Sequence, residues 1–272
     1  MNFRLFLITF CLATSTFATP NIAVSIKPLN GIVTELTLGI TTPKLLLKSN
    51  NSAHNFHLKP TQLLQINSAD LVVFVHPNFE INFKKVLKSI KNDKKISLSQ
   101  GGKNHHLWLD VEKMIEFSQR LSQKLIQIDG KNQAIYITNL KNLMQKLQTL
   151  KAEIRNEFIR KKQQKVISFS NAFAYFLSAN GLENSLIISD NHGDRMSLFK
   201  ILNARKSIKK SIKSSKKNQA ICLLHTTQTP KKSIKTLTEN LPINIENIDI
   251  IGNGNYFKLM RKITSQVSRC LR

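Results

Sequence analysis

The sequence predicts an α/β protein with two lobes, each built on a mostly parallel sheet, joined by one long rigid helix. Three observations predict this fold class. Short apolar runs suited to buried parallel strands recur along the chain, and amphipathic helical stretches lie between most of them. The runs also fall into two groups, separated by about ninety residues that contain no such run.

Residues 1–18 have the pattern of an export signal. Arg4 supplies a positive charge, an apolar run covers residues 5–12, and small residues lead up to Ala18. We expect cleavage after Ala18. A lipid anchor on Cys11 is the alternative, but bulky Phe10 before it does not match the small residue that a lipoprotein signal needs. The run is too short to span a bilayer.

The two groups of apolar runs define the lobes. The first lobe, residues 19–128, has predicted strands at 22–26, 45–47 and 71–75. The second lobe, residues 164–272, has predicted strands at 166–169, 186–188, 221–224 and 243–248. The helical periodicity between successive strands predicts crossover helices, and so a parallel order in each sheet.

The segment between the lobes, residues 129–163, predicts a single long helix. It has neither proline nor an interrupting glycine after its start, and its apolar side chains recur every three or four residues at Tyr136, Leu140, Leu143, Leu147, Leu150, Ile154 and Phe158. About 30 residues would extend roughly 45 Å. A coiled-coil dimer is the alternative. One segment of this length between two sheets favours packing against its own lobes, and we expect a monomer.

The formal net charge is +25, which raises nucleic acid or an anionic membrane as partners. Lysine greatly outnumbers arginine, whereas phosphate and base recognition favours the planar guanidinium group. The densest basic stretch, residues 204–217, places Ile208 and Ile212 four apart and is typical of a solvated helix face. We therefore expect no nucleic-acid partner.

Two of the three cysteines, Cys222 and Cys270, remain after removal of the signal. An even pair in an oxidising compartment predicts a disulfide bond. The alternative is two unrelated buried thiols.

Polar side chains that can bind a metal follow several of the predicted strands. Ligands of open parallel sheets lie beyond the carboxyl ends of the strands. The side chains at or near these ends are His54, His57, His76, His225 and Asp249, and His105 and His106 precede a helix. Imidazole nitrogen and carboxylate oxygen suit zinc.

The sequence gives little sign of catalysis. It has no nucleophile elbow, no HExxH motif and no phosphate-binding glycine loop, and Cys222 lies inside an apolar strand. A metallohydrolase with zinc-bound water is the enzyme alternative. Its nearest base would be Glu80, for which we expect a solvated position at a helix start. We therefore predict that the protein is not an enzyme.

Six motifs resemble the solute-binding proteins of zinc and manganese ABC transporters, and the zinc-uptake members most. They occur in the family's order, from Ile22 to Leu271: SIKPL at 25–29, AHNFHLKPTQ at 53–62, ADLVVFVHPNFE at 69–80, HLWLD at 106–110, NAFAYF at 171–176 and NIDIIG at 247–252.

The resemblance implies a zinc ion held in a cleft between the lobes and delivered in the periplasm to an ABC permease with its cytoplasmic ATPase. It places family ligands on His54, where Ala53 replaces the usual proline, and on His106 and Asp249. It also implies the Cys222–Cys270 pair.

Two departures from the family qualify this expectation. The third family ligand, histidine in zinc proteins and glutamate in manganese proteins, falls on Ser170, whose neutral hydroxyl is a poor zinc ligand. The family's His-rich acidic loop is reduced to about residues 99–105. We name His225 as a candidate replacement ligand. The alternative functions are the same fold with a decayed site, acting as an adhesin or stress-binding protein, and a manganese-binding relative.

Overall fold

The first lobe contains a parallel sheet of four strands in the order β2-β1-β3-β4. The structure is a computed structural model that describes residues 19–47, 57–189, 196–215 and 219–272. The strands are β1 (Ile22–Val24), β2 (Lys44–Leu45), β3 (Leu71–Phe74) and β4 (Lys95–Ser97). The helices of this lobe are α1 (Lys27–Leu36), α2 (Pro60–Asn67), α3 (Lys84–Ser89) and α4 (Val111–Ile128), with short 3-10 turns η1 (Ile81–Phe83), η2 (Asn92–Lys94) and η3 (Leu107–Leu109).

The second lobe repeats this plan with strand order β6-β5-β7-β8, again all parallel. Its strands are β5 (Lys165–Ser170), β6 (Asn184–Ser189), β7 (Ile221–Thr226) and β8 (Asn244–Ile248). Its helices are α6 (Ala174–Ala179), α7 (Leu198–Lys213), α8 (Lys231–Thr238) and α9 (Tyr256–Cys270), with the turn η6 (Asn171–Phe173) before α6. The α/β class with two mostly parallel sheets is therefore confirmed.

Strand β4 was not expected, so the prediction of a strand-free stretch between the two groups was wrong. Its three residues pair with β3 in the register Val73↔Ile96. All three are only half-buried, and Ile96 is the one apolar side chain among them. An edge strand this short has no apolar run that could mark it in the sequence.

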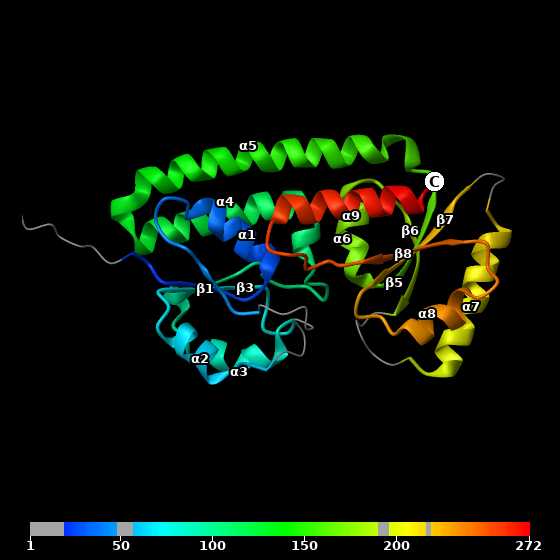
Figure 1. The fold of residues 1–272 in the computed structure, drawn as a ribbon, viewed down its shortest axis with the longest axis horizontal. Helices are drawn as coiled ribbons and strands as arrows, with labels where there is room; N and C mark the ends of the chain where they lie inside the picture. Colours follow the sequence, from blue (N-terminus) through cyan, green and yellow to red (C-terminus); the bar gives the residue numbers. More distant parts are fainter. Residues whose placement is uncertain (1–18, 48–56, 190–195, 216–218) are drawn as a thin grey trace, which may run out of the picture.

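The segment predicted to link the lobes contains η4 (Gly130–Asn132), the 26-residue helix α5 (Gln133–Phe158) and η5 (Ile159–Lys161). At 1.5 Å per residue α5 is about 39 Å long, and in Figure 1 it extends over both lobes. Its buried stripe includes Leu143, Leu147 and Leu150, and α5 packs against α1, α4 and α9. The stripe expected for a coiled coil is thus covered by the chain's own helices.

One hydrophobic core runs through both lobes. It joins side chains of the first sheet, such as Val73, to side chains of the second, such as Leu224, through α5 and α9. Helix α9 returns from the second lobe to lie against α1 of the first (Figure 1). The approach is close at Gly31, where an added Cβ would lie 2.6 Å from the carbonyl oxygen of Gly254. The shared core holds the two sheets in a fixed relation.

The predicted disulfide bond between Cys222 and Cys270 is present, with a Cα–Cα distance of 5.4 Å. It fastens the end of α9 to the buried strand β7. Within the described ranges, the helices are each too short or too polar to cross a bilayer. The predicted signal, residues 1–18, lies outside these ranges.

Candidate metal centre

The carboxyl edge of the first sheet carries a buried carboxyl group, Glu80. Its Oε2 accepts hydrogen bonds from the backbone N–H groups of Val75 (3.0 Å) and His76 (3.3 Å), just beyond β3. The side chain has no exposed surface, and burial raises its pKa to about 7. The solvated position expected for Glu80 was therefore wrong, because the carboxyl group turns back to satisfy the end of the strand.

His106 lies at the start of η3 and is 3% exposed. Its ring packs between two aromatic side chains, with centroid distances of 5.2 Å to Phe79 and 5.0 Å to Trp108. This packing restricts the ring to one orientation, as a preformed ligand requires.

Asn104 determines which ring nitrogen of His106 carries the proton. Its Nδ2 donates to the carbonyl of Asn171 (2.8 Å), so its Oδ1 faces the backbone N–H of His106 (3.0 Å) and the ring Nδ1 (2.8 Å). An amide oxygen can only accept, so Nδ1 is the donor, and in the neutral imidazole the lone pair is on Nε2. This is the tautomer that coordinates a metal through Nε2 while a second hydrogen bond orients the ring.

Asp249 follows β8 and is also held by backbone groups. Its Oδ1 accepts hydrogen bonds from the N–H groups of Ile251 and Gly252, both at 3.0 Å. Gly252 has a φ of +66°, which favours glycine, and an added Cβ would lie 3.0 Å from Leu259. One carboxylate oxygen is thus fixed by the turn.

Trp108 ties the His106 segment to the Asp249 segment. Its indole Nε1 donates to the carbonyl of Ile250 (2.9 Å), and its own carbonyl accepts from the hydroxyl of Tyr256 (2.9 Å). All three side chains are buried. Two segments that carry expected ligands, one from each lobe, are therefore joined directly.

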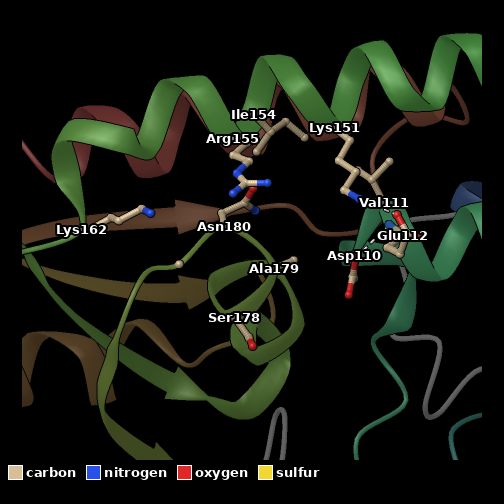
Figure 2. A pocket seen from close by; sticks show the side chains of 11 residues that line it. Asp110, Val111, Glu112, Lys151, Ile154, Arg155, Lys162, Ser178, Ala179 and Asn180 are labelled. Carbon is tan, nitrogen blue, oxygen red and sulfur yellow. Dashed lines mark hydrogen bonds and ion pairs between the residues drawn. The ribbon is translucent and has the colours of Figure 1, made fainter.

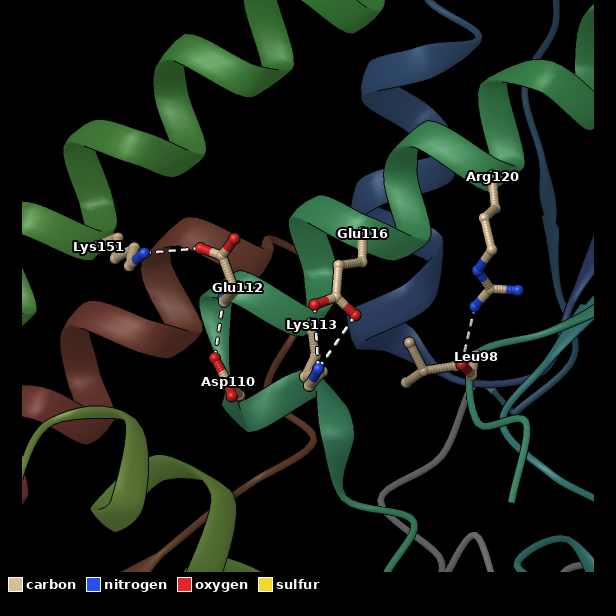
Figure 3. Close-up of polar contacts among 7 residues, drawn as sticks. All are labelled: Leu98, Asp110, Glu112, Lys113, Glu116, Arg120 and Lys151. Atoms are coloured by element: carbon tan, nitrogen blue, oxygen red, sulfur yellow. Dashed lines mark hydrogen bonds and ion pairs between the residues drawn. The ribbon is translucent and has the colours of Figure 1, made fainter. Parts of the chain in front are cut away.

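Helix α4, which follows η3, is fixed at its start and middle (Figure 3). Asp110 caps it by accepting from the N–H of Glu112 (2.9 Å), and Glu112 pairs with Lys151 of α5 (2.7 Å). Further along, Arg120 donates to the carbonyl of Leu98, the residue after β4 (3.0 Å). These contacts hold both ends of the segment that contains Asn104 and His106.

Ser170, the last residue of β5, is 2% exposed, and its Oγ has no hydrogen-bond partner in the described part of the chain. A buried hydroxyl without a partner is unfavourable. The next residue, Asn171, accepts the hydrogen bond from Asn104 through its carbonyl. Ser170 thus belongs to the same junction as His106, with an unused polar atom.

His225 points to the other face of the second sheet. Side chains alternate along a strand. Leu223 and His225 therefore share the face that packs against α7 and α8, whereas Ser170 lies opposite Phe169, which is on that face. Burial lowers the pKa of His225, and its Nδ1 lies 3.1 Å from the carbonyl of Thr226.

The remaining histidines fall in different surroundings. His54 lies outside the described residues, and His57 is exposed. His76 stacks on the buried His105 with 4.0 Å between ring centroids, and His105 Nδ1 lies 2.9 Å from Ser99 Oγ. Among the described residues, no three His, Cys, Asp or Glu side chains form a group able to hold a metal ion. His106, Asp249 and His225 therefore do not form such a set.

A cavity of about 420 Å³ lies beside this junction, between the start of α4, the helix α5 and the end of α6 (Figure 2). Its lining includes Glu112, Lys151 and Arg155 and none of the expected ligands. The cavity is thus separate from the candidate metal centre.

Sequence reasoning missed the positioning role of Asn104 and the joining role of Trp108. Asn104 lies in an irregular segment of an asparagine-rich chain, where nothing distinguishes it. The position of Trp108 next to His106 in HLWLD was visible in the sequence, but its partner, the carbonyl of Ile250, is 142 residues away.

Two parallel sheets fixed around a shared core and a long helix, with polar strand ends facing one junction, define the class of two-lobed solute-binding proteins. The family described as the periplasmic zinc-uptake complex component A matches residues 22–270. The chain belongs to this family.

Individual relatives agree with this membership. The high-affinity zinc uptake system protein ZnuA of Haemophilus ducreyi is 25% identical, with 96% of each chain covered. The iron ABC transporter substrate-binding lipoprotein MtsA of Streptococcus pyogenes is 26% identical over 67% of each chain. A crystal structure of ZnuA superposes with a TM-score of 0.80 at 20% identity, covering 94% of this chain and 100% of that one.

Proposed function

We propose that this protein captures zinc in the periplasm and delivers it to an ABC permease that works with a cytoplasmic ATPase. The proposed ligands are His54, His106 and Asp249. The observation that carries the proposal is the hydrogen bond between Trp108 and Ile250, which holds the segments of His106 and Asp249 together across the lobes.

The chemistry of the described ligands supports zinc. His106 directs a neutral Nε2, and Asp249 has one carboxylate oxygen occupied by backbone N–H groups, so each supplies one donor atom. With His54 they give a three-ligand set of imidazole and carboxylate, typical of zinc sites that keep a fourth, open position. Ser170, at the position of the third family ligand, offers only a weak neutral oxygen donor.

We propose that the site prefers zinc to iron and manganese. Zinc accepts a tetrahedral site of few ligands, whereas manganese favours more oxygen ligands. The relative named for iron transport makes this preference worth testing directly. A binding role needs no general base, and the proposal includes no enzyme activity.

Growth of a strain that lacks the protein tests the transport function. We expect a growth defect in zinc-limited medium that added zinc corrects and added manganese does not. The wild-type gene should restore growth, and a His106→Ala variant exported in equal amounts should not. Rescue by manganese alone would indicate the other metal.

The second candidate is the same fold with a decayed site, acting as an adhesin or stress-binding protein. It is favoured by the serine at the position of the third family ligand, since a hydroxyl binds zinc weakly. Under this alternative, wild-type and His106→Ala proteins would support growth equally in zinc-limited medium.

A further inference from the structure

Helix α7, on the outside of the second lobe (Figure 1), has an unusual solvent-facing side. Ile201 and Ile208 face the sheet and are buried. The opposite face is apolar at its start and basic along the rest of the helix. The exposed residues of this face are Leu198, Phe199, Leu202, Asn203, Lys206, Lys209, Lys210 and Lys213.

The apolar part of this face exposes an unusually large amount of apolar side-chain surface to water. Leu198 is 65% exposed, Phe199 is 73% exposed and Leu202 is 44% exposed. They occupy the first turns of the helix and so lie next to one another. Single exposed apolar residues are common, but three adjacent ones indicate a surface that another apolar phase covers.

The basic part extends onto the neighbouring helix. Helices α7 and α8 pack side by side, and α8 adds the exposed Lys231, Lys232 and Lys235. Across residues 196–215 and 219–243, Glu239 is the only acidic residue. No salt bridge among the described residues includes a lysine of either helix. The layer thus presents a positive field that the protein itself does not neutralise.

We propose that this α7/α8 surface binds the face of an anionic phospholipid bilayer. Apolar side chains beside a dense set of lysines are the pattern of segments that lie at a membrane interface, with the apolar groups inserted at the headgroup boundary. Lysines act as point charges toward a diffuse negative surface and do not require the matched geometry that arginine provides for a defined partner. The charge complementarity therefore favours lipid over an acidic protein.

This inference is independent of the metal site, because none of the proposed ligands lies on α7 or α8. Binding to the bilayer would hold the exported protein in a thin layer above the membrane that contains a permease. The attraction is electrostatic over most of the surface, so it should weaken as salt shortens the Debye length.

Vesicle flotation of the whole exported protein tests the proposal. The probes are vesicles of phosphatidylcholine alone and vesicles that also contain phosphatidylglycerol. One variant carries Lys206→Gln, Lys209→Gln, Lys210→Gln and Lys213→Gln, and a second carries Phe199→Ser and Leu202→Ser. The matched control removes four exposed lysines of the first lobe: Lys85→Gln, Lys88→Gln, Lys91→Gln and Lys94→Gln. Leu64→Ser, at a residue that is 69% exposed, is the control for the apolar change.

We expect the wild-type protein to float only with the anionic vesicles. The α7 lysine variant should lose affinity by well over tenfold, since four lysines near such a surface each contribute to the attraction. The double serine variant should also bind less, and both controls should bind as wild type.

Two results would overturn the proposal. One is equal loss of binding in the α7 and control lysine variants, which would mean that net charge alone acts. The other is failure of the wild-type protein to bind either kind of vesicle. If the α7 changes then weaken binding to a purified permease, the surface binds a protein and the proposal is also wrong. Because all the changed residues are exposed, thermal unfolding is expected to show intact folding.

Discussion

The side chain of Asn104 joins the two lobes at the carbonyl of Asn171, 67 residues away, through a hydrogen bond of 2.8 Å. The Oδ1 atom of the same side chain accepts a hydrogen bond from His106 Nδ1. One amide thus couples the orientation of a proposed ligand to the position of the opposite lobe. The coupling predicts different effects for two substitutions of Asn104.

Asn104→Ala removes both hydrogen bonds. We expect zinc affinity to fall about 10- to 100-fold, the usual effect of losing the group that orients a metal-bound histidine. Asn104→Asp keeps an acceptor for His106 but cannot donate to Asn171, so we expect a smaller loss. Isothermal titration with zinc at neutral pH measures both. Equal affinities in wild type and Asn104→Ala would show that the ring needs no such support.

Glu80 predicts a pH dependence of stability. Its folded-state pKa of about 7 exceeds its ordinary value of 4.5 because it is buried. The stabilisation that it gives is therefore complete below pH 4.5 and is lost as pH rises through about 7. The total change is about 3 kcal/mol.

Chemical unfolding of Glu80→Gln and wild type between pH 4 and 9 checks this dependence. As pH rises, the free energy of unfolding of the wild type should fall relative to that of Glu80→Gln. Glu183→Gln, at an exposed position, is the control and should follow wild type. A constant difference across the range would contradict the raised pKa.

The sequence predicted the parts of the fold that depend on local patterns. Apolar runs such as the one at Leu71–Phe74 and the helical stripe of α5 have periods that show directly in the residues. Strand β4 was missed because an edge strand of three half-buried residues leaves no such run. The disulfide between Cys222 and Cys270 needed only the count of cysteines and the expected compartment.

The candidate site was less predictable because its organisation depends on contacts between distant segments. The family resemblance indicated His106 and Asp249 as expected ligands. The hydrogen bond from Trp108 to Ile250, however, joins distant segments and is visible only in the folded chain. The pattern of apolar runs also did not predict on which face of the sheet a given strand residue lies. His225 was expected at the cleft edge, but in β7 it continues the side that packs on α7 and α8.

Ser170 and His225 can be separated by a pair of substitutions. Ser170→His restores a nitrogen donor at a buried position whose hydroxyl has no partner in the described residues, and we expect zinc to bind more tightly by at least an order of magnitude. His225→Ala should leave zinc affinity unchanged, because the residue faces away from Ser170. Weaker binding in His225→Ala would restore His225 as a ligand.

The disulfide bond should make a large contribution to stability. It closes a loop with a sequence separation of 48 residues, and chain entropy predicts a loss of about 4 kcal/mol in unfolding free energy when both cysteines are replaced. Urea unfolding of Cys222→Ala with Cys270→Ala, compared with the oxidised wild type, measures this loss. A difference below about 1 kcal/mol would mean that the α9 packing holds the C-terminus without the bond.

His106 and Asp249 are proposed to hold a zinc ion at the junction of the lobes. Competition with a chromophoric zinc chelator, followed from pH 5 to pH 8, tests it most directly. We predict one zinc per chain, weaker binding below about pH 6 as imidazole is protonated, and an affinity lower by orders of magnitude in His106→Ala. The exposed His57→Ala variant should bind as wild type. A wild-type protein that takes no zinc from the chelator, or equal affinities in all three proteins, would contradict the account.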